Sequence, residues 1–351
     1  AWAVEHASLL LHGLLRRVGP RWKILLPDLL RLRTGNRFHA EMSRYARAVG
    51  CSWRDVMIAN VASELAIGRI GCSGALLATE RGPVMARNMD FWPPDVLARA
   101  GARILYRRAG RPVMVVAGWP GAVAVVSGVT LRPGGNSFAI ATHAAPVGSD
   151  IDLTGAPVGL SVRAILEDAA NFDDAVRRVR TFRIGGPCIF ALVGERNDQR
   201  AVVERAPRRE AVITPDPARP DAPLVVTNHF RALPASDDAR VPPLYRSSVP
   251  RMERIGACCA AWDPRHDPGD HALLAMLADP LVAQDFTAQH MVIRPWAAGA
   301  WNDGAAPGAP PHRHAPRVAQ DAALDSVRVW MPARWAGDDH PRGAGAATPT
   351  L

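Results

Sequence analysis

A single cysteine and the hairpin after it carry the clearest chemistry in this sequence. The segment 72–90 begins at Cys72 with small residues, turns at 81–83 (Arg-Gly-Pro) and returns as a second strand ending in Arg-Asn-Met-Asp. Such a hairpin brings Arg87 and Asp90 back beside Cys72. A nearby guanidinium favours the thiolate, which is the nucleophilic form of cysteine. The pattern therefore predicts a nucleophilic thiol flanked by one cation and one carboxylate.

This hairpin resembles that of acid ceramidase and N-acylethanolamine acid amidase, which are N-terminal-nucleophile hydrolases of the choloylglycine hydrolase superfamily. Bile-salt hydrolases and penicillin V acylases are more distantly similar. In these families a precursor cleaves itself just before a cysteine, which becomes both the nucleophile and the new N-terminus. The resemblance implies autocleavage between Gly71 and Cys72. The mammalian enzymes have one more residue in the hairpin, a difference that a tight turn accommodates.

The resemblance also implies roles for the hairpin residues. The freed α-amine, with a pKa of about 7.7–8, would take the thiol proton near neutral pH, so Cys72 would supply both nucleophile and base. Asp90 would orient that amine, and Arg87 would hold Cys72 and stabilise negative charge. Without the resemblance, a buried structural thiol is the commonest fate of a cysteine such as Cys72, and Arg87 and Asp90 would be a surface ion pair worth about 0–1 kcal/mol.

A second motif is the strand 225–230 (Val-Val-Thr-Asn-His-Phe). The family has a similar Thr-Asn at a strand end, which implies that Asn228 donates a hydrogen bond to the tetrahedral oxyanion. Losing such a donor typically lowers the rate about 100- to 1000-fold. His229 is interpreted as a neighbour, because the family chemistry needs no imidazole.

A third motif, 247–254 (Ser-Ser-Val-Pro-Arg-Met-Glu-Arg), resembles a helix start in bile-salt hydrolases and penicillin acylases. This resemblance implies that Arg251 is a buried arginine near the nucleophile. Alignment to acid ceramidase gives Arg246 as the rival. An ordinary N-capped helix with exposed arginines is the alternative that needs no resemblance.

Two further segments support the resemblance. Residues 127–134 (Ser-Gly-Val-Thr-Leu-Arg-Pro-Gly) are similar to an LTGxRPG segment of the family, which is usually followed by an asparagine. That asparagine is absent: Thr142 or His143 lies near its place, and Asn136 lies earlier. The identity of a second oxyanion donor therefore stays open. Residues 184–194 resemble the core strand that follows a helix pair.

Periodicity and turn residues predict the elements that position these motifs. Residues 1–71 are predicted to be a helical segment, broken at Pro20 and Pro27, which the family resemblance makes an α-subunit that stays attached after cleavage. Predicted helices are 37–48 with Gly50 as its stop, 53–66 with Ser52 as its N-cap, a pair over 159–182 whose second member starts at Phe172, 250–261 and 270–278. Predicted strands are 72–79, 83–88, 103–107, 112–117, 122–127, 137–142, 188–194, 201–205, 210–213, 223–227, 289–295 and 325–331.

The order sheet, helix pair, sheet is a layered α+β pattern. It fits the αββα sandwich that the resemblance implies, preceded by the small helical segment. We expect the hydrolase domain over 72–334, with a Gly/Ala/Pro/His-rich flexible insertion at about 302–322. Residues 335–351 are predicted to be a disordered tail.

Composition limits the classes of protein. With 351 residues, 48% hydrophobic and 21% charged, the chain can bury a sizeable core. No apolar run reaches eighteen residues, so no transmembrane helix is expected. The net charge of +9 comes from scattered arginines beside a single lysine, Lys23, a composition typical of GC-rich coding. We therefore predict no nucleic-acid partner. Residues 8–15 are too short for a span and lack a clear cleavage site, so we predict no signal peptide, and the compartment is left between cytoplasmic and exported.

The remaining reactive side chains indicate neither metal nor cofactor. The five cysteines, at 51, 72, 188, 258 and 259, form no CxxC pair or metal-spaced set, and their odd number argues against a disulfide scaffold. The sequence does not decide whether Cys51 forms a disulfide with another cysteine. His312 and His314 are interpreted as loop residues, because no further ligands accompany them.

Together, the residues and the resemblance predict an autoproteolytic cysteine amidase. It would hydrolyse a linear C–N amide bond of an N-acylated lipid or amine through a Cys72 thioester. Residues 91–94 (Phe-Trp-Pro-Pro) either line an acyl pocket or pack in the core. Expected partners are a small-molecule N-acyl amide, the two cleaved subunits for each other, and at most a transient lipid surface. Two alternatives are an acyltransferase of the same fold and a non-catalytic relative that acts as a binding protein.

Overall fold

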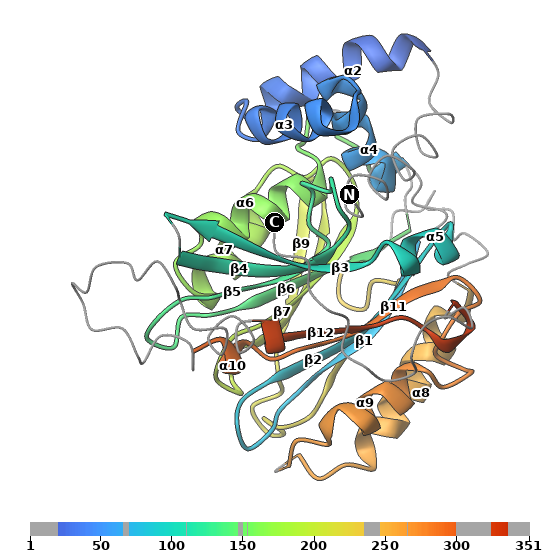
Figure 1. Ribbon diagram of the computed structural model, residues 1–351. Helices are drawn as coiled ribbons and strands as arrows, with labels where there is room; N and C mark the ends of the chain where they lie inside the picture. The colour runs from blue at the N-terminus through green and yellow to red at the C-terminus, as the bar shows by residue number, and fades with distance from the viewer. Residues whose placement is uncertain are drawn as a thin grey trace.

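The computed structural model describes residues 20–65, 70–109, 111–146, 150–152, 154–234, 246–264, 266–299 and 324–335 (Figure 1). The predicted insertion at about 302–322, with His312 and His314, lies outside the described residues. So do the predicted tail beyond residue 335 and the predicted helical pieces before Pro20. Within the described ranges, no helix combines the length and the apolar character needed to cross a bilayer.

Two antiparallel sheets form the centre of the molecule. The first has five strands, in the order β10 (Leu224–Val226), β1 (Ile70–Leu77), β2 (Val84–Phe91), β11 (Thr287–Ile293) and β12 (Val327–Trp330). The second has seven, in the order β3 (Ala102–Arg108), β4 (Arg111–Gly118), β5 (Ser127–Thr130), β6 (Ala139–Ala144), β7 (Cys188–Val193), β8 (Arg200–Ala206) and β9 (Arg209–Ile213). The candidate nucleophile therefore lies on an inner strand of the smaller sheet.

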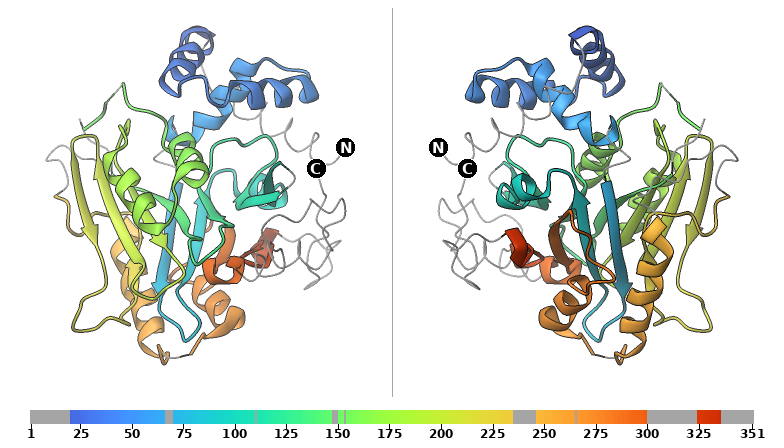
Figure 2. Two further views of the ribbon diagram at one scale, coloured as in Figure 1. Left: turned by 90° about the vertical axis from the view of Figure 1, so that its left-hand side faces the viewer. Right: turned by 90° about the vertical axis from the view of Figure 1, so that its right-hand side faces the viewer.

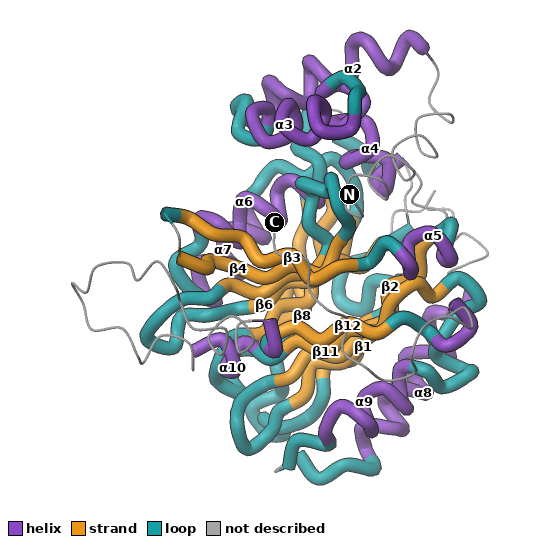
Figure 3. The backbone as a smooth tube through the Cα atoms, viewed as in Figure 1, coloured by secondary structure: helices purple, strands orange, loops and turns teal. Residues whose placement is uncertain are grey.

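Helix pairs cover the two outer faces of the sheets (Figure 3). The pair α6 (Val158–Asp168) and α7 (Phe172–Thr181) packs on the larger sheet, and α8 (Ser248–Ala260) and α9 (Gly269–Leu277) pack on the smaller one. Short helices α5 (Pro94–Arg99) and α10 (Pro295–Gly299) and the 3-10 turn η3 (Ala333–Trp335) complete the described elements. Helix, sheet, sheet and helix form four layers, which confirms the predicted α+β class and αββα sandwich.

Separate apolar clusters hold the layers together. One lies between the sheets and includes Cys72, Met89 and Ala141. A second joins the larger sheet to α6 and α7, and a third joins the smaller sheet to α8 and α9. Strand β7 is buried on both faces and is accordingly apolar throughout (Cys-Ile-Phe-Ala-Leu-Val), whereas the equally buried β2 carries Arg87, Asn88 and Asp90. The site is thus built inside the sandwich, between two rigid sheets.

Three helices precede the sandwich and pack over one end of it (Figures 1 and 2). They are α2 (Pro20–Arg33), α3 (His39–Val49) and α4 (Trp53–Leu65). Gly50 ends α3 with a φ of 70°, and Ser52 starts α4 in reciprocal hydrogen bonds with Asp55, as a capping box does. Both predicted helix signals are confirmed.

Two element predictions are wrong. α2 continues through Pro27, which was expected to break it, since the fixed φ of proline is itself helical. Residues 122–126 form a loop before β5 instead of a strand, although Val123 and Val125 are buried in alternation. Asn60 of α4 accepts hydrogen bonds from the backbone N–H groups of Val123 and Ala124, at 2.6 and 2.7 Å, and so replaces a strand partner.

Candidate active site

The β1–β2 hairpin sets the position of the thiol. Its register pairs Gly71 with Asp90 and Gly74 with Arg87. A Cβ atom at Gly74 would lie 2.5 Å from the Ala86 carbonyl oxygen and 3.0 Å from the Arg87 Cβ, so only glycine permits this approach. The hairpin therefore brings the predicted arginine and carboxylate back beside the cysteine.

Arg87 contacts the thiol directly. Its Nη2 lies 3.0 Å from Cys72 Sγ, while Nη1 donates to the Val126 carbonyl at 3.0 Å and to Ser127 Oγ at 2.5 Å. The arginine is fully buried. Because Val126 and Ser127 belong to the larger sheet and its preceding loop, this guanidinium links the two sheets across the thiol.

Asn228 and Arg251 hold the backbone of Cys72. Asn228 follows β10, and its Oδ1 accepts from the Cys72 backbone N–H at 2.9 Å, while Nδ2 donates to the Ala144 carbonyl at 2.8 Å. Arg251 of α8 donates through Nη1 to the Cys72 carbonyl at 2.7 Å and through Nη2 to Asn228 Oδ1 at 2.9 Å. Arg246, the rival position, is exposed. Of the two arginines, Arg251 is the one beside the thiol.

Asp90 lies on the helix side of the smaller sheet, against Gly71. Its Oδ1 accepts from Thr287 Oγ1 at 2.6 Å, and its Oδ2 lies 3.6 Å from Arg251 Nη1. A Cβ at Gly71 would stand 3.1 Å from that same Oδ2. Among the described residues, Oδ2 has no hydrogen-bond donor. One carboxylate oxygen thus remains available beside the predicted scissile bond.

Burial dominates the electrostatics of the thiol. It raises the pKa of Cys72, although the charges of Arg87 and Arg251 and a backbone hydrogen bond from Ala144 oppose the rise. Burial likewise raises the pKa of Asp90, against the influence of Arg251 and Thr287. Arg87 favours the thiolate as predicted, but desolvation outweighs it, so the thiol needs a base before it can attack.

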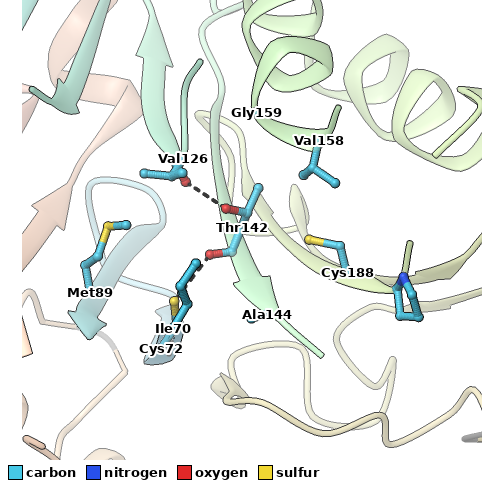
Figure 4. A pocket seen from close by; sticks show the side chains of 10 residues that line it. Ile70, Cys72, Met89, Val126, Thr142, Ala144, Val158, Gly159 and Cys188 are labelled. Carbon is cyan, nitrogen blue, oxygen red and sulfur yellow. Dashed lines mark hydrogen bonds between the residues drawn. The ribbon is translucent and has the colours of Figure 1, made fainter. Parts of the chain in front are cut away.

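A small apolar cavity opens beside the thiol (Figure 4). Its volume is about 70 Å³. It is lined by Ile70, Cys72, Met89, Val126, Thr142, Ala144, Val158, Gly159, Pro187 and Cys188. The predicted pocket segment 91–94 does not contribute: Phe91 packs edge-on against Trp119 in the core, and Trp92 is half exposed.

The other candidate residues take different places. His229 bonds to Ser248 Oγ at 2.8 Å, and Ser248 Oγ in turn accepts from the Asn228 backbone N–H, so this histidine lies beside the support of Asn228. Asn136 lies in an exposed turn with its amide on the Pro133 carbonyl. Thr142 contributes its backbone oxygen, which lies 3.6 Å from Cys72 Sγ (Figure 4).

Sequence reasoning missed the residues that support this site through side-chain hydroxyls. Ser127 accepts a hydrogen bond from Arg87, and Thr287 donates one to Asp90. Ser248 accepts one from the backbone N–H of Asn228. Hydroxyl residues are too common in strands and caps to be singled out without the fold. All five cysteines, Cys51 included, are free thiols. In the described ranges, no group of three or more His, Cys, Asp or Glu residues could hold a metal ion.

Known proteins resemble this chain both in sequence and in structure. The family model described as acyl-coenzyme A:6-aminopenicillanic acid acyl-transferase matches residues 136–286. The matched range includes Asn228 and Arg251 and begins after the cysteine hairpin. Among curated proteins, no sequence matches this chain.

The second similarity is structural. The Caenorhabditis elegans ortholog of N-acylethanolamine-hydrolyzing acid amidase has 16% identity and a TM-score of 0.53, over 74% of this chain and 100% of that chain. At this identity the likeness shows a shared fold. Together with the family match, it confirms the resemblance inferred from the cysteine hairpin. A mutant of Anbu from a Hyphomicrobium strain covers 64% of this chain and 82% of that chain at 12% identity, with a TM-score of 0.26 that is too low to indicate a shared fold.

Proposed function

We propose that the protein is a self-processing cysteine amidase that hydrolyses a linear amide bond of an N-acylated lipid or amine. The observation that carries the proposal is the enclosure of Cys72: Arg87 on its thiol, Asn228 on its backbone nitrogen and Arg251 on its carbonyl. Nucleophilic catalysis needs a thiol held beside donors for developing negative charge.

The first reaction is cleavage of the chain itself. The thiol proton leaves as Cys72 Sγ attacks the Gly71 carbonyl carbon, and it is passed on to the departing nitrogen. The C–N bond between the two residues breaks as the nitrogen takes a proton, leaving a thioester. Water then hydrolyses the thioester to a Gly71 carboxylate and a free thiol. The product carries a Cys72 α-amine, which lies between Asn228 Oδ1 and the unfilled oxygen of Asp90.

The second reaction uses that amine as the base. An α-amine has an ordinary pKa of about 8, so part of it is neutral near neutral pH and can accept the thiol proton as Sγ attacks. It thereby supplies the base that the raised pKa of the buried thiol requires. Sγ attacks the substrate carbonyl, the leaving amine departs with the proton, and an acyl thioester remains. Water releases the acid and restores the thiol. Neither reaction requires a metal or an organic cofactor.

The cavity beside Cys72 supports an apolar acyl group in the substrate. Its lining is mainly aliphatic and includes Met89, Val126 and Val158 (Figure 4). Burial of each methylene contributes about 0.8 kcal/mol to binding. Ile70 also lines the cavity and lies just before the proposed cut, so cleavage frees one wall of it to move. We therefore favour lipid-like N-acyl amides over polar peptides.

Trapping of the acyl-enzyme tests this proposal. The protein is mixed with an N-acyl p-nitroanilide series, quenched in acid and digested for peptide mass mapping. The acyl mass should appear on Cys72 and vanish in Cys72→Ala. Cys188→Ala is the matched control, since it removes the other thiol of the cavity and should keep the label. Acyl label on Cys188 alone, or none on either thiol in a self-cleaved protein, would contradict the proposal.

Acyl transfer is the second candidate, because the matching family model is described as an acyl-transferase. Both reactions share the thioester, and they differ only in whether water or an amine takes the acyl group. Product analysis with and without an added amine separates them. Hydrolysis predicts free acid in both mixtures, whereas a dominant new amide would favour the transferase.

A further inference from the structure

The cavity beside Cys72 joins two layers of the sandwich. At one end, Cys72 and Met89 belong to the apolar cluster between the sheets. At the other end, which we call the outer end, Cys188 belongs to the cluster under α6 and α7, and Val158 packs against that cluster. Thr142 of β6 lies between the two ends (Figure 4). The cavity therefore leads from the thiol, past β6, to the helix layer.

Exposure to solvent changes across the cavity. Cys72 and Met89 are each 1% exposed, whereas Val126, Ala144 and Val158 are only partly buried. The thiol thus lies at the buried end, and the opening is on the side of the three partly buried residues. A chain attached to a carbonyl at the thiol would start in the interior and reach solvent only after passing through the cavity.

Close packing holds the outer end in place. The carbonyl of Gly159 on α6 accepts from the Val125 backbone N–H at 2.9 Å, and a Cβ at this glycine would lie 2.8 Å from the Ala124 Cβ. The thiol of Cys188 donates to the His143 carbonyl at 3.4 Å. None of these contacts involves a residue beside the proposed cut, so the outer end should keep its shape after self-cleavage.

The volume of about 70 Å³ limits the length of chain that the cavity can cover. Each water-sized group needs about 10–15 Å³ of such space, and a methylene is of similar size, so the cavity holds about five to seven carbon atoms. Each methylene that becomes buried improves affinity roughly fourfold, whereas one that stays in water adds nothing. The gain from a longer chain should therefore end where the cavity ends.

We propose that the acyl site is built for a medium-length chain, about six to eight carbons including the carbonyl, and that Val158 and Cys188 set this limit. This inference rests on the proposed amidase function. The carbonyl carbon lies at Cys72, the following carbons fill the cavity, and any further carbons reach solvent. Movement of Ile70 after the cut adds room beside the thiol, where the amide group itself lies, and not at the outer end.

A series of N-acyl p-nitroanilides from acetyl to dodecanoyl provides the test, because the leaving group stays the same while the chain grows. Each member is used below the concentration at which it aggregates. The value of kcat/KM should rise roughly fourfold with each methylene up to about six to eight carbons and rise no further beyond. A rise that continues unbroken to dodecanoyl, or no rise after acetyl, would overturn the inference.

Substitutions at the outer end test the two lining residues. Val158→Ser removes apolar surface there and should lower kcat/KM for the octanoyl substrate roughly tenfold relative to the propionyl one. Val249→Ser is the matched control, since it makes the same change in the first turn of α8, at a valine that is 45% exposed and does not line the cavity. It should leave the ratio unchanged.

Cys188→Leu should make the rise end at a chain about two carbons shorter, because the larger side chain takes up that space. Overpacking can prevent this variant from folding, so Val158→Ser, at a partly exposed position, is the deciding variant. An octanoyl-to-propionyl ratio in Val158→Ser equal to that of the wild type would overturn the assignment.

The same measurements separate this inference from the proposed function. A wild type that cleaves itself and hydrolyses these amides without the predicted end to the rise overturns only the chain-length limit. A wild type that neither cleaves itself nor turns over any member of the series overturns the proposed function and this inference together.

Discussion

Each polar atom of Cys72 contacts a residue from a different part of the chain. Arg87 of β2 holds the thiol, Asn228 after β10 holds the nitrogen, and Arg251 of α8 holds the carbonyl. Three elements far apart in sequence thus converge on one residue. A charged hydrogen bond of this kind contributes roughly 1.5–3 kcal/mol when both partners are present, and its loss leaves a buried group unpaired.

Arg251 should matter for folding as well as for the reaction. Arg251→Gln removes the cation beside Asp90 and leaves that carboxylate buried without a charge partner, which typically costs about 3–5 kcal/mol. Urea unfolding should therefore show a large loss of stability. Arg246→Gln, at the exposed rival position, should change stability by less than about 0.5 kcal/mol. Equal effects of the two variants would contradict the assignment of Arg251.

The sequence predicted which residues meet at the site but not their electrostatics. Cys72, Arg87 and Asp90 follow from one hairpin, whose register is a local property. The pKa of the thiol depends on burial by both sheets, which no local pattern carries. The choice between Arg251 and Arg246 depends on tertiary packing, because Arg251 lies on the buried face of α8 whereas Arg246 precedes the helix and is exposed.

At the scale of the element, the hairpin depends on a missing side chain. Gly74 lies across from Arg87, and a Cβ there would collide with the backbone oxygen of Ala86 at 2.5 Å. Backbone cannot yield as a flexible side chain does. The close pairing of β1 and β2, and with it the contact between guanidinium and thiol, therefore requires glycine at this position.

Gly74→Ala should separate the two strands and weaken the contact of Arg87 with Cys72. Overpacking of this kind usually destabilises by about 1–3 kcal/mol. Gly256→Ala on α8 is the matched control, since its added Cβ meets nothing within 4 Å and should stabilise the helix by about 0.5–1 kcal/mol. Thermal melting and the rate of thiol labelling measure both. An unchanged melting point and labelling rate for Gly74→Ala would refute the packing argument.

Most elements could be predicted because their periodicity and stop signals are local. The α3 stop at Gly50 and the α4 cap at Ser52 are examples. The loop before β5 could not be predicted, because its alternating valines look like a strand and only the contact with Asn60 replaces strand pairing. Pro27 was misjudged for a related reason: proline is unfavourable inside a helix but not forbidden.

At the scale of the whole molecule, the N-terminal helices are tied to the site. Asn60 holds the loop that ends at Val126, and the Val126 carbonyl accepts from Arg87. Arg37 of the same helical segment pairs with Glu167 and Asp168 on α6. The helices therefore support one wall of the cavity, and we expect the two subunits to stay together after cleavage.

Loss of Asn60 should loosen that association. Asn60→Ala leaves the N–H groups of Val123 and Ala124 without their acceptor, at about 1–3 kcal/mol for each group that stays buried. In size-exclusion runs over a urea series, the cleaved fragments of the wild type should elute together to a higher urea concentration than those of the variant. Asn136→Ala, in an exposed turn, should behave as the wild type does. Identical urea profiles for all three proteins would refute the coupling.

Stability should fall as the pH drops below about 6.5. Burial and the charge of Arg334 lower the pKa of His290 to about 4. Between pH 4 and 6.5 the unfolded chain therefore binds a proton that the folded chain does not, so folding is favoured less as pH falls, by on the order of 2–3 kcal/mol at pH 4.5. Urea midpoints at pH 7 and 4.5 should show a smaller drop for His290→Gln. An equal drop in both proteins would contradict the role of His290.

The intact mass of the purified protein tests the central claim most directly, since the proposed activation depends on a cut between Gly71 and Cys72. The wild type should give two masses that join at this bond, and Cys72→Ala should give one uncut chain. Both proteins are held over a range of pH before measurement, so that a slow reaction is not missed. A single uncut chain for both at every pH would contradict Cys72 as a self-processing nucleophile.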